Sequence, residues 1–283
     1  MSTRSIALAN QKGGVGKTTT AVSLAACLAE RGKRVLLVDL DPQANATSAL
    51  GLEKLSGGSV YKALLGGAQL ADSIRPSGYE NLEIIPSEVD LAVAEVDVAR
   101  TENYLQRMRM ALMPVHDANR YDYLLVDCPP SLGILTMNAL AAVDRVLVPL
   151  QCEYFALEGL AVIMRVLQQI KQSGANPGLE LEGIVMTMFD GRTNLSQQVV
   201  NEVRGHFGEK VFKTIIPRTV RLGEAPSFGK PITVYDTHSQ AAVAYRALAA
   251  EVIGLASPAP TAPPSEKAAS PVESPSPTPL PTA

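Results

Sequence analysis

The segment ANQKGGVGKTTT, residues 9–20, constrains the fold more than any other part of the chain. It follows a short apolar run at 5–9 and leads into a helical pattern that begins at Lys17. A glycine-rich turn between a strand and a helix, ending in Gly-Lys-Thr, is typical of a phosphate-binding loop. The loop is unusual, because Gln11 stands where the motif expects its first glycine and a second lysine, Lys12, lies inside it. The segment therefore predicts a nucleotide-binding domain with a modified phosphate loop.

Apolar runs that suit strands alternate with longer helical patterns along the chain. The expected strands are 5–10, 34–40, 81–87, 121–129, 145–151, 181–188 and 210–217. The expected helices are 17–31, 89–113, 132–142, 156–172, 195–207 and 239–253. Several strands are apolar at consecutive positions, as strands covered on both faces are. This order predicts an α/β fold, a doubly wound and mainly parallel sheet with helices on both faces.

Composition sets the domain boundary. Residues 1–255 have enough apolar content for one large core, and we interpret them as a single ATPase domain of the phosphate-loop type. Residues 256–283 are rich in Pro, Ser, Thr and Ala, and such a segment cannot bury enough apolar surface to offset its ordering entropy. We expect this segment to be a disordered tail.

Each residue of the loop has an expected role. Lys17 should reach the β- and γ-phosphates, Thr18 should hold Mg²⁺ through its hydroxyl, and Thr19 should bond the α-phosphate. No guanine-specific Asn-Lys-x-Asp run is present, so the expected nucleotide is ATP, with its base near Pro217. The predicted nucleotide-binding residues are Gly13, Gly14, Val15, Gly16, Lys17, Thr18, Thr19 and Pro217.

Acidic residues end two of the expected strands. Asp39 and Asp41 follow the second strand, and Asp127 closes the run YLLVD. Because ligands of parallel sheets lie beyond the carboxyl ends of the strands, these carboxylates should meet at the phosphate loop. Thr18, Asp41 and Asp127 are the expected metal-binding residues, and Asp39 could help to hold the metal's water. Asp41 is also placed to orient the attacking water. Together with the two lysines of the loop, Lys12 and Lys17, it makes up the expected catalytic set.

Charge, cysteine spacing and hydropathy argue against a uniformly basic nucleic-acid-binding protein, a cysteine metal site and a membrane-spanning protein. The net charge is only −3, so any nucleic-acid contact must come from a local basic patch. The three cysteines, Cys27, Cys128 and Cys152, fit no metal spacing and are expected to be buried thiols. No apolar run is long enough to span a bilayer, and we expect a cytoplasmic protein.

Lys12 admits two interpretations. It could add to phosphate affinity within its own chain. It could instead point across an interface to the nucleotide of a second copy, so that ATP would stabilise a dimer and hydrolysis would release it.

Several motifs together resemble a known family. KGGVGKTTT resembles the modified phosphate loop of the ParA/MinD class, and VDLDPQANATSALG, DCPPSLG, PLQCEYFALEGL and PRTVRLGEAPSFGKPI resemble its chromosomal ParA (Soj) branch of DNA-partition ATPases. The resemblance covers roughly 4–253 and implies an ATP-dependent sandwich homodimer in which Lys12 acts in trans. It also implies non-specific DNA binding on the nucleoid and hydrolysis stimulated by a ParB-type protein.

The resemblance assigns DNA contacts to loop cations. The arginines that match are Arg192 and Arg221, and Arg218 and Lys230 lie nearby. Arg218 could instead shape the base pocket. The alternative is a MinD-like membrane-positioning ATPase, which needs a C-terminal amphipathic helix with a basic face. The chain ends in Pro, Ser, Thr and Ala instead, so we expect no membrane contact.

Overall fold

The structure is a computed structural model that describes residues 3–54 and 60–254. The predicted tail at 256–283 lies outside the described residues. No helix in the described part is long and apolar enough to cross a membrane.

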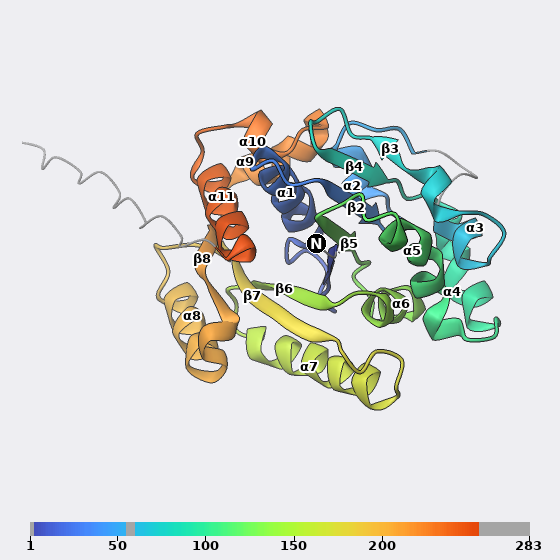
Figure 1. The fold of residues 1–283 in the computed structure, drawn as a ribbon. Coiled ribbons are helices and arrows are strands. Elements are labelled where there is room, and N and C mark those ends of the chain that lie inside the picture. The colour runs from blue at the N-terminus through green and yellow to red at the C-terminus, as the bar shows by residue number, and fades with distance from the viewer. Residues whose placement is uncertain (1–2, 55–59, 255–283) are drawn as a thin grey trace, which may run out of the picture.

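An eight-stranded sheet forms the centre of the described chain (Figure 1). The strand order is β3-β4-β2-β5-β1-β6-β7-β8. All neighbouring strands pair in parallel except β3, which runs antiparallel to β4 at one edge. The strands are β1 (Arg4–Leu8), β2 (Val35–Asp39), β3 (Arg75–Pro76), β4 (Leu82–Ile85), β5 (Tyr123–Asp127), β6 (Arg145–Gln151), β7 (Glu180–Phe189) and β8 (Val211–Pro217).

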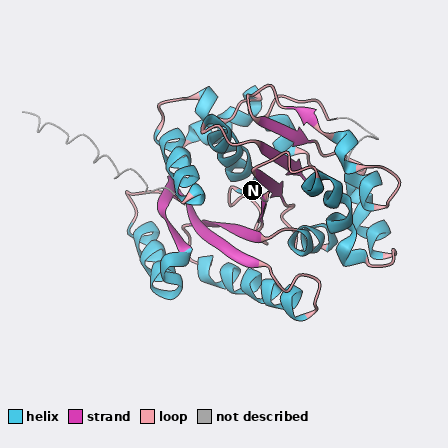
Figure 2. Cartoon of the chain, viewed as in Figure 1, coloured by secondary structure: helices cyan, strands magenta, loops and turns pink. Residues whose placement is uncertain are grey.

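Helices cover both faces of this sheet (Figure 2). They are α1 (Lys17–Glu30), α2 (Asn45–Ala49), α3 (Val60–Leu64), α4 (Leu91–Ala99), α5 (Arg107–Asp117), α6 (Ile134–Ala142), α7 (Ala156–Gln172), α8 (Asn194–Phe207), α9 (Val220–Glu224), α10 (Ile232–Tyr235) and α11 (Gln240–Ile253). One core cluster joins the sheet to α3–α8, and a second joins it to α1, α2, α10 and α11. The predicted doubly wound α/β architecture is confirmed.

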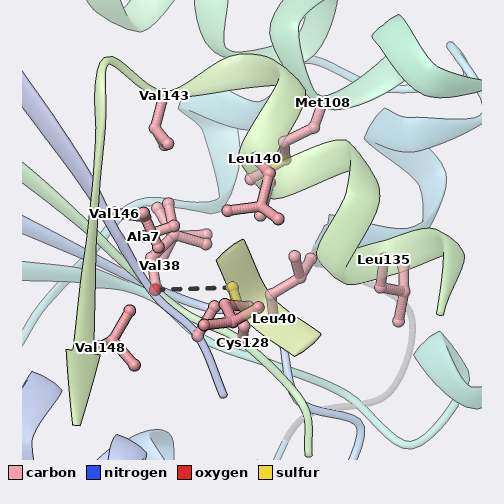
Figure 3. Packing of buried hydrophobic residues seen from close by; sticks show 14 of the residues in the cluster. Ala7, Val38, Leu40, Met108, Cys128, Leu135, Leu140, Val143, Val146 and Val148 are labelled. Carbon is pink, nitrogen blue, oxygen red and sulfur yellow. Dashed lines mark hydrogen bonds between the residues drawn. The ribbon is translucent and has the colours of Figure 1, made fainter. Parts of the chain in front are cut away.

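The first cluster reaches the end of β5. Figure 3 shows Cys128 packed among residues of the sheet and of α6, with its Sγ 3.9 Å from the carbonyl oxygen of Val126. Burial raises the pKa of this thiol. All three cysteines are free and buried, as predicted.

One predicted helix is wrong. The pattern at 89–113 predicted a single helix, but the structure has α4 and α5, separated at 100–106. Asn103 adopts a left-handed backbone (φ 55°), which ends helical continuity. The carbonyl of Val98 accepts from both the hydroxyl (2.7 Å) and the backbone N–H (3.0 Å) of Thr101, and these two bonds close the end of α4.

Candidate functional site

The phosphate loop joins β1 to α1 at the carboxyl edge of the sheet. Gly14 and Gly16 have positive φ angles of 75° and 88°, which residues with a Cβ rarely adopt. Gly16 precedes α1 and has no side chain to cap it, so the first-turn N–H groups stay available to an anion. The hydroxyl of Thr187 donates to the carbonyl of Val15 (2.9 Å), and this bond fixes the loop against β7.

The two lysines of the loop point in different directions. Lys17 is buried, and its Nζ donates to the carbonyl of Lys12 at 2.9 Å. Burial lowers the pKa of Lys17, although Asp127, Cys128 and Asp41 oppose this shift. Lys12, whose side chain is 49% exposed, forms an ion pair with Glu153 after β6. Lys17 therefore belongs to the interior of the site, whereas Lys12 belongs to its surface.

The acidic side chains converge as the sequence predicted. Asp39 and Asp127 are register partners at the ends of β2 and β5. Asp127 is fully buried, and neither of its carboxylate oxygens has a hydrogen-bond partner. Burial, and next the charge of Asp39, raise the pKa of Asp127 well above its usual range, while Thr18 and Lys17 oppose the rise. Such a carboxylate suits a hydrated divalent cation, which would supply the missing compensation.

Asp39 has a different environment. Its Oδ2 accepts from the backbone N–H (2.8 Å) and the hydroxyl (2.7 Å) of Thr47, and its Oδ1 accepts from the N–H of Asp41 (3.2 Å). Burial raises its pKa to about 6, although the bonds from Thr47 oppose the rise. The contacts favour a structural role for Asp39, holding α2 against β2, over the predicted help with metal-bound water. Thr47 has no motif of its own in the sequence.

Asp41 lies beyond β2, next to these two acids. It is buried, and its Oδ1 accepts from the N–H of Gln43 at 2.9 Å. The hydroxyl of Ser87 donates to its backbone carbonyl (2.6 Å), which fixes the loop that carries it. Asp41 is thus held in a defined position at the mouth of the site.

A cavity of about 390 Å³ borders the phosphate loop. Its lining includes Thr18 and Thr19, from the first turn of α1, and Lys230, which precedes α10. The other lining residues are Val22, Ser23, Asn45, Ser48, Ala49, Leu222, Ala225, Pro226, Ser227, Pro231 and Ile232. Pro217, the predicted base contact, ends β8 and is not among the lining residues. Sequence reasoning missed the contribution of α2 to this lining, although α2 lies within the segment VDLDPQANATSALG that resembles the family.

The remaining cations follow β7 and β8. Arg192, with its side chain 88% exposed, holds Asp190 through two bonds of 2.9 and 2.7 Å. This contact lowers the pKa of Asp190 to about 2. The N–H of Arg218 donates to the carbonyl of Phe189 (2.9 Å), which brings the two loops together. Arg221, on α9, pairs with Glu224 (3.1 Å) and Asp236 (3.5 Å). Three arginines thus share one end of the sheet, whereas Lys230 lies at the cavity.

Comparisons with known proteins agree on the kind of protein. A family model described as an AAA domain matches residues 3–181. The chain is 52% identical over 248 residues to the sporulation initiation inhibitor protein Soj of Bacillus subtilis, covering 87% of this chain and 97% of that one. It is 51% identical over 251 residues to the chromosome partitioning protein ParA of Myxococcus xanthus, covering 88% of each.

A solved structure shares the fold. Cobyrinic acid a,c-diamide synthase from Mycobacterium smegmatis, with a bound ATP analogue and magnesium, is 37% identical and superposes with a TM-score of 0.75. The match covers 89% of this chain and 94% of that one.

Proposed function

The chain belongs to the ParA/Soj family of chromosome-partitioning proteins, and we propose that it is a magnesium-dependent ATPase that switches between a free and a DNA-bound state. The observation that carries this proposal is the convergence of Lys17, Asp41 and the fully buried Asp127 at a loop with open N–H groups. Neither a scaffold nor a simple binding domain needs a buried carboxylate without a partner, since it costs stability.

Each group of the site has a separate task in hydrolysis. The N–H groups of 13–19 and the ammonium of Lys17 bind the phosphates of ATP, and Lys17 gives up its bond to the Lys12 carbonyl to do so. Thr18 and Asp127 would hold Mg²⁺, which neutralises charge that develops on the phosphates. Asp41 orients the attacking water and accepts hydrogen bonds from it.

The surface position of Lys12 supports a role between two copies of the chain. Its ion pair with Glu153 is partly solvated, so it is weak and can be exchanged for a stronger partner. The phosphates of a second copy's ATP would be such a partner, because they carry several negative charges. Dimerisation would then depend on ATP, and hydrolysis would return Lys12 to Glu153.

The dimer would bind DNA through its arginines. Arg192, Arg218 and Arg221 lie at the carboxyl ends of neighbouring strands, and Lys230 would join them if it turned out of the cavity. Two copies double the number of phosphate contacts, which raises affinity for DNA steeply and independently of sequence. A ParB-type protein bound to DNA would stimulate hydrolysis and release the dimer from the nucleoid, so that repeated cycles separate replicated DNA.

The test is binding to a random-sequence DNA duplex with ATP and with ADP, each at two salt concentrations. We expect binding only with ATP, and a loss of affinity as salt rises. Equal binding with the two nucleotides, or no binding with either, would separate the ATP site from DNA and reject the switch.

A further inference from the structure

Two loops that are far apart in the sequence meet through a pair of glycines. Gly51 follows α2, and Gly229 lies between α9 and α10. A Cβ added at Gly229 would lie 2.6 Å from the Cα of Gly51, and one added at Gly51 would lie 3.2 Å from the carbonyl oxygen of Gly229. Both glycines also have positive φ angles, of 75° and 61°. The contact is therefore made by backbone alone, and neither side has room for a side chain without a shift.

The Gly51 side of this contact leads back to the loop that carries Asp41. The N–H of Ala44 donates to the carbonyl of Asp41 (2.8 Å), and the N–H of Ser48 donates to the carbonyl of Ala44 (3.1 Å). The N–H of Gly51 then donates to the carbonyl of Ser48 (2.9 Å). These bonds run from before the first residue of α2 to beyond its last, so a displacement of the Asp41 loop can reach Gly51 through one short helix.

The Gly229 side of the contact leads to Arg221, one of the proposed DNA contacts. The N–H of Gly229 donates to the carbonyl of Pro226 (3.0 Å), and the N–H of Lys230 donates to the carbonyl of Ala225 (3.3 Å). The N–H of Ala225 in turn donates to the carbonyl of Arg221 at the end of α9. The backbone from Arg221 to Lys230 is thus hydrogen-bonded as one unit, which ends at the glycine contact.

A contact between two backbones passes on a small movement more directly than a contact between side chains. Long side chains can absorb a displacement by changing rotamer, whereas two backbones in van der Waals contact have no such freedom. The hydroxyl of Tyr79 donates to the carbonyl of Gly229 (3.4 Å) and helps to hold the contact closed. Because α2 and the segment 225–232 also line the cavity beside the phosphate loop, this contact lies next to the ATP site.

We propose that Gly51 and Gly229 couple the ATP site to the segment that carries Arg221. When ATP binding changes the Asp41 loop, α2 moves, and the glycine contact passes this movement to Arg221. Dimerisation alone would raise DNA affinity by doubling the number of contacts, whereas this route makes the Arg221 of each copy sensitive to the nucleotide of that same copy. The coupling rests on the proposed function, because it assumes that nucleotide and DNA bind at the two ends of the route.

A glycine variant with a matched control tests the contact. Gly51→Ala adds a methyl group 3.2 Å from the carbonyl oxygen of Gly229 and should separate the two loops in every nucleotide state. The measurement is the ratio of the dissociation constants for a random-sequence DNA duplex with ADP and with a non-hydrolysable ATP analogue, at low salt. We expect this ratio to fall by about tenfold, whichever state the added methyl group favours, because the coupling is lost. Gly174→Ala is the control, since Gly174 has a similar φ of 77° but open space around it.

Two further variants and one assay separate lost coupling from local damage. Tyr79→Phe removes the bond to Gly229 without adding an atom, and should lower the ratio by about twofold. Gly229→Ala should lower it at least as far as Gly51→Ala, and if Gly229→Ala does not fold, Gly51→Ala decides alone. Sedimentation velocity should show that Gly51→Ala still dimerises with the ATP analogue. An unchanged ratio in Gly51→Ala, an equal fall in Gly174→Ala, or loss of the dimer in Gly51→Ala would each overturn the coupling.

Hydrogen exchange distinguishes a failure of the coupling from a failure of the proposed function. Amides within 225–230 should change their exchange rates when the ATP analogue binds the unmodified chain, and should not change in Gly51→Ala. No change in the unmodified chain would overturn the coupling. If Gly51→Ala removes such a change in a chain that binds no DNA with either nucleotide, the coupling would stand and the proposed function would be rejected.

Discussion

Asp127 is the residue at which function and stability conflict most directly. It is fully buried, its oxygens have no partner, and its pKa is raised by burial and by Asp39. For an acid, a raised pKa in the folded chain means that the folded state binds more protons than the unfolded state, so stability falls as pH rises. The Asp127 side chain therefore serves the functional site and does not stabilise the fold.

Replacing Asp127 with Asn should stabilise the nucleotide-free chain at pH 8, by about 1 kcal/mol or more, because it removes a buried charge. The gain should shrink as pH falls, because the raised pKa of Asp127 lets its carboxyl take up a proton in the folded chain and lose the charge that the substitution removes. Thermal melts at several pH values measure this effect. The same variant should lose the additional stability that Mg²⁺ gives with ATP.

The control lies at the other end of the same strand. Asp122 precedes β5, and hydrogen bonds from Arg34 lower its pKa. Its charged form is favoured by folding, so Asp122→Asn should destabilise the chain at pH 8. If both variants shifted the melting temperature in the same direction, the argument from burial would be wrong.

Glu153 sets the starting position of Lys12. Removing its charge by Glu153→Gln should free Lys12 and lower the ATP concentration needed for dimerisation, by about two- to fivefold for a partly exposed ion pair. Sedimentation velocity across an ATP titration measures this. Glu158→Gln, on the exposed first turn of α7, is the matched control. A requirement for more ATP in Glu153→Gln would show that Glu153 supports the dimer and does not restrain it.

At the scale of elements, hydrophobic periodicity predicted the long, regular helices and strands. It missed features that depend on the backbone of one residue or on contacts between distant parts of the chain. The bounds of β6 and α7 match the prediction, since both are long and regular. The break between α4 and α5 depends on the backbone of Asn103, which hydrophobic spacing does not record. The ion pair of Lys12 with Glu153 joins residues 141 positions apart, so only the folded chain shows it.

The arginines in the loops after β7 and β8 allow a prediction about DNA binding. Arg221→Glu should abolish ATP-dependent DNA binding, because it places a negative charge beside Glu224 and Asp236 where phosphates would lie. Arg120→Glu is the control, since Arg120 is also exposed and ion-paired, with Glu83, but lies just before β5 at the opposite edge of the sheet. Filter binding at one salt concentration compares them. Equal losses in both variants would point to net charge and not to the arginine loops.

At the scale of the whole molecule, the proposed cycle needs assembly and hydrolysis to be separable. The side chain of Asp41 accepts from the N–H of Gln43, whereas its bonds with Asp39, Ala44 and Ser87 use backbone atoms that alanine keeps. Asp41→Ala should therefore leave the fold and the phosphate loop intact. Without a group to orient water, hydrolysis should fall by about 100-fold or more. The variant should therefore bind ATP, form the dimer and stay on DNA, because nothing returns it to the free state. Phosphate release and sedimentation with DNA, measured on the same sample, test this. Normal turnover would remove Asp41 from the mechanism, whereas slow turnover without a lasting dimer would show that ATP binding alone does not drive assembly.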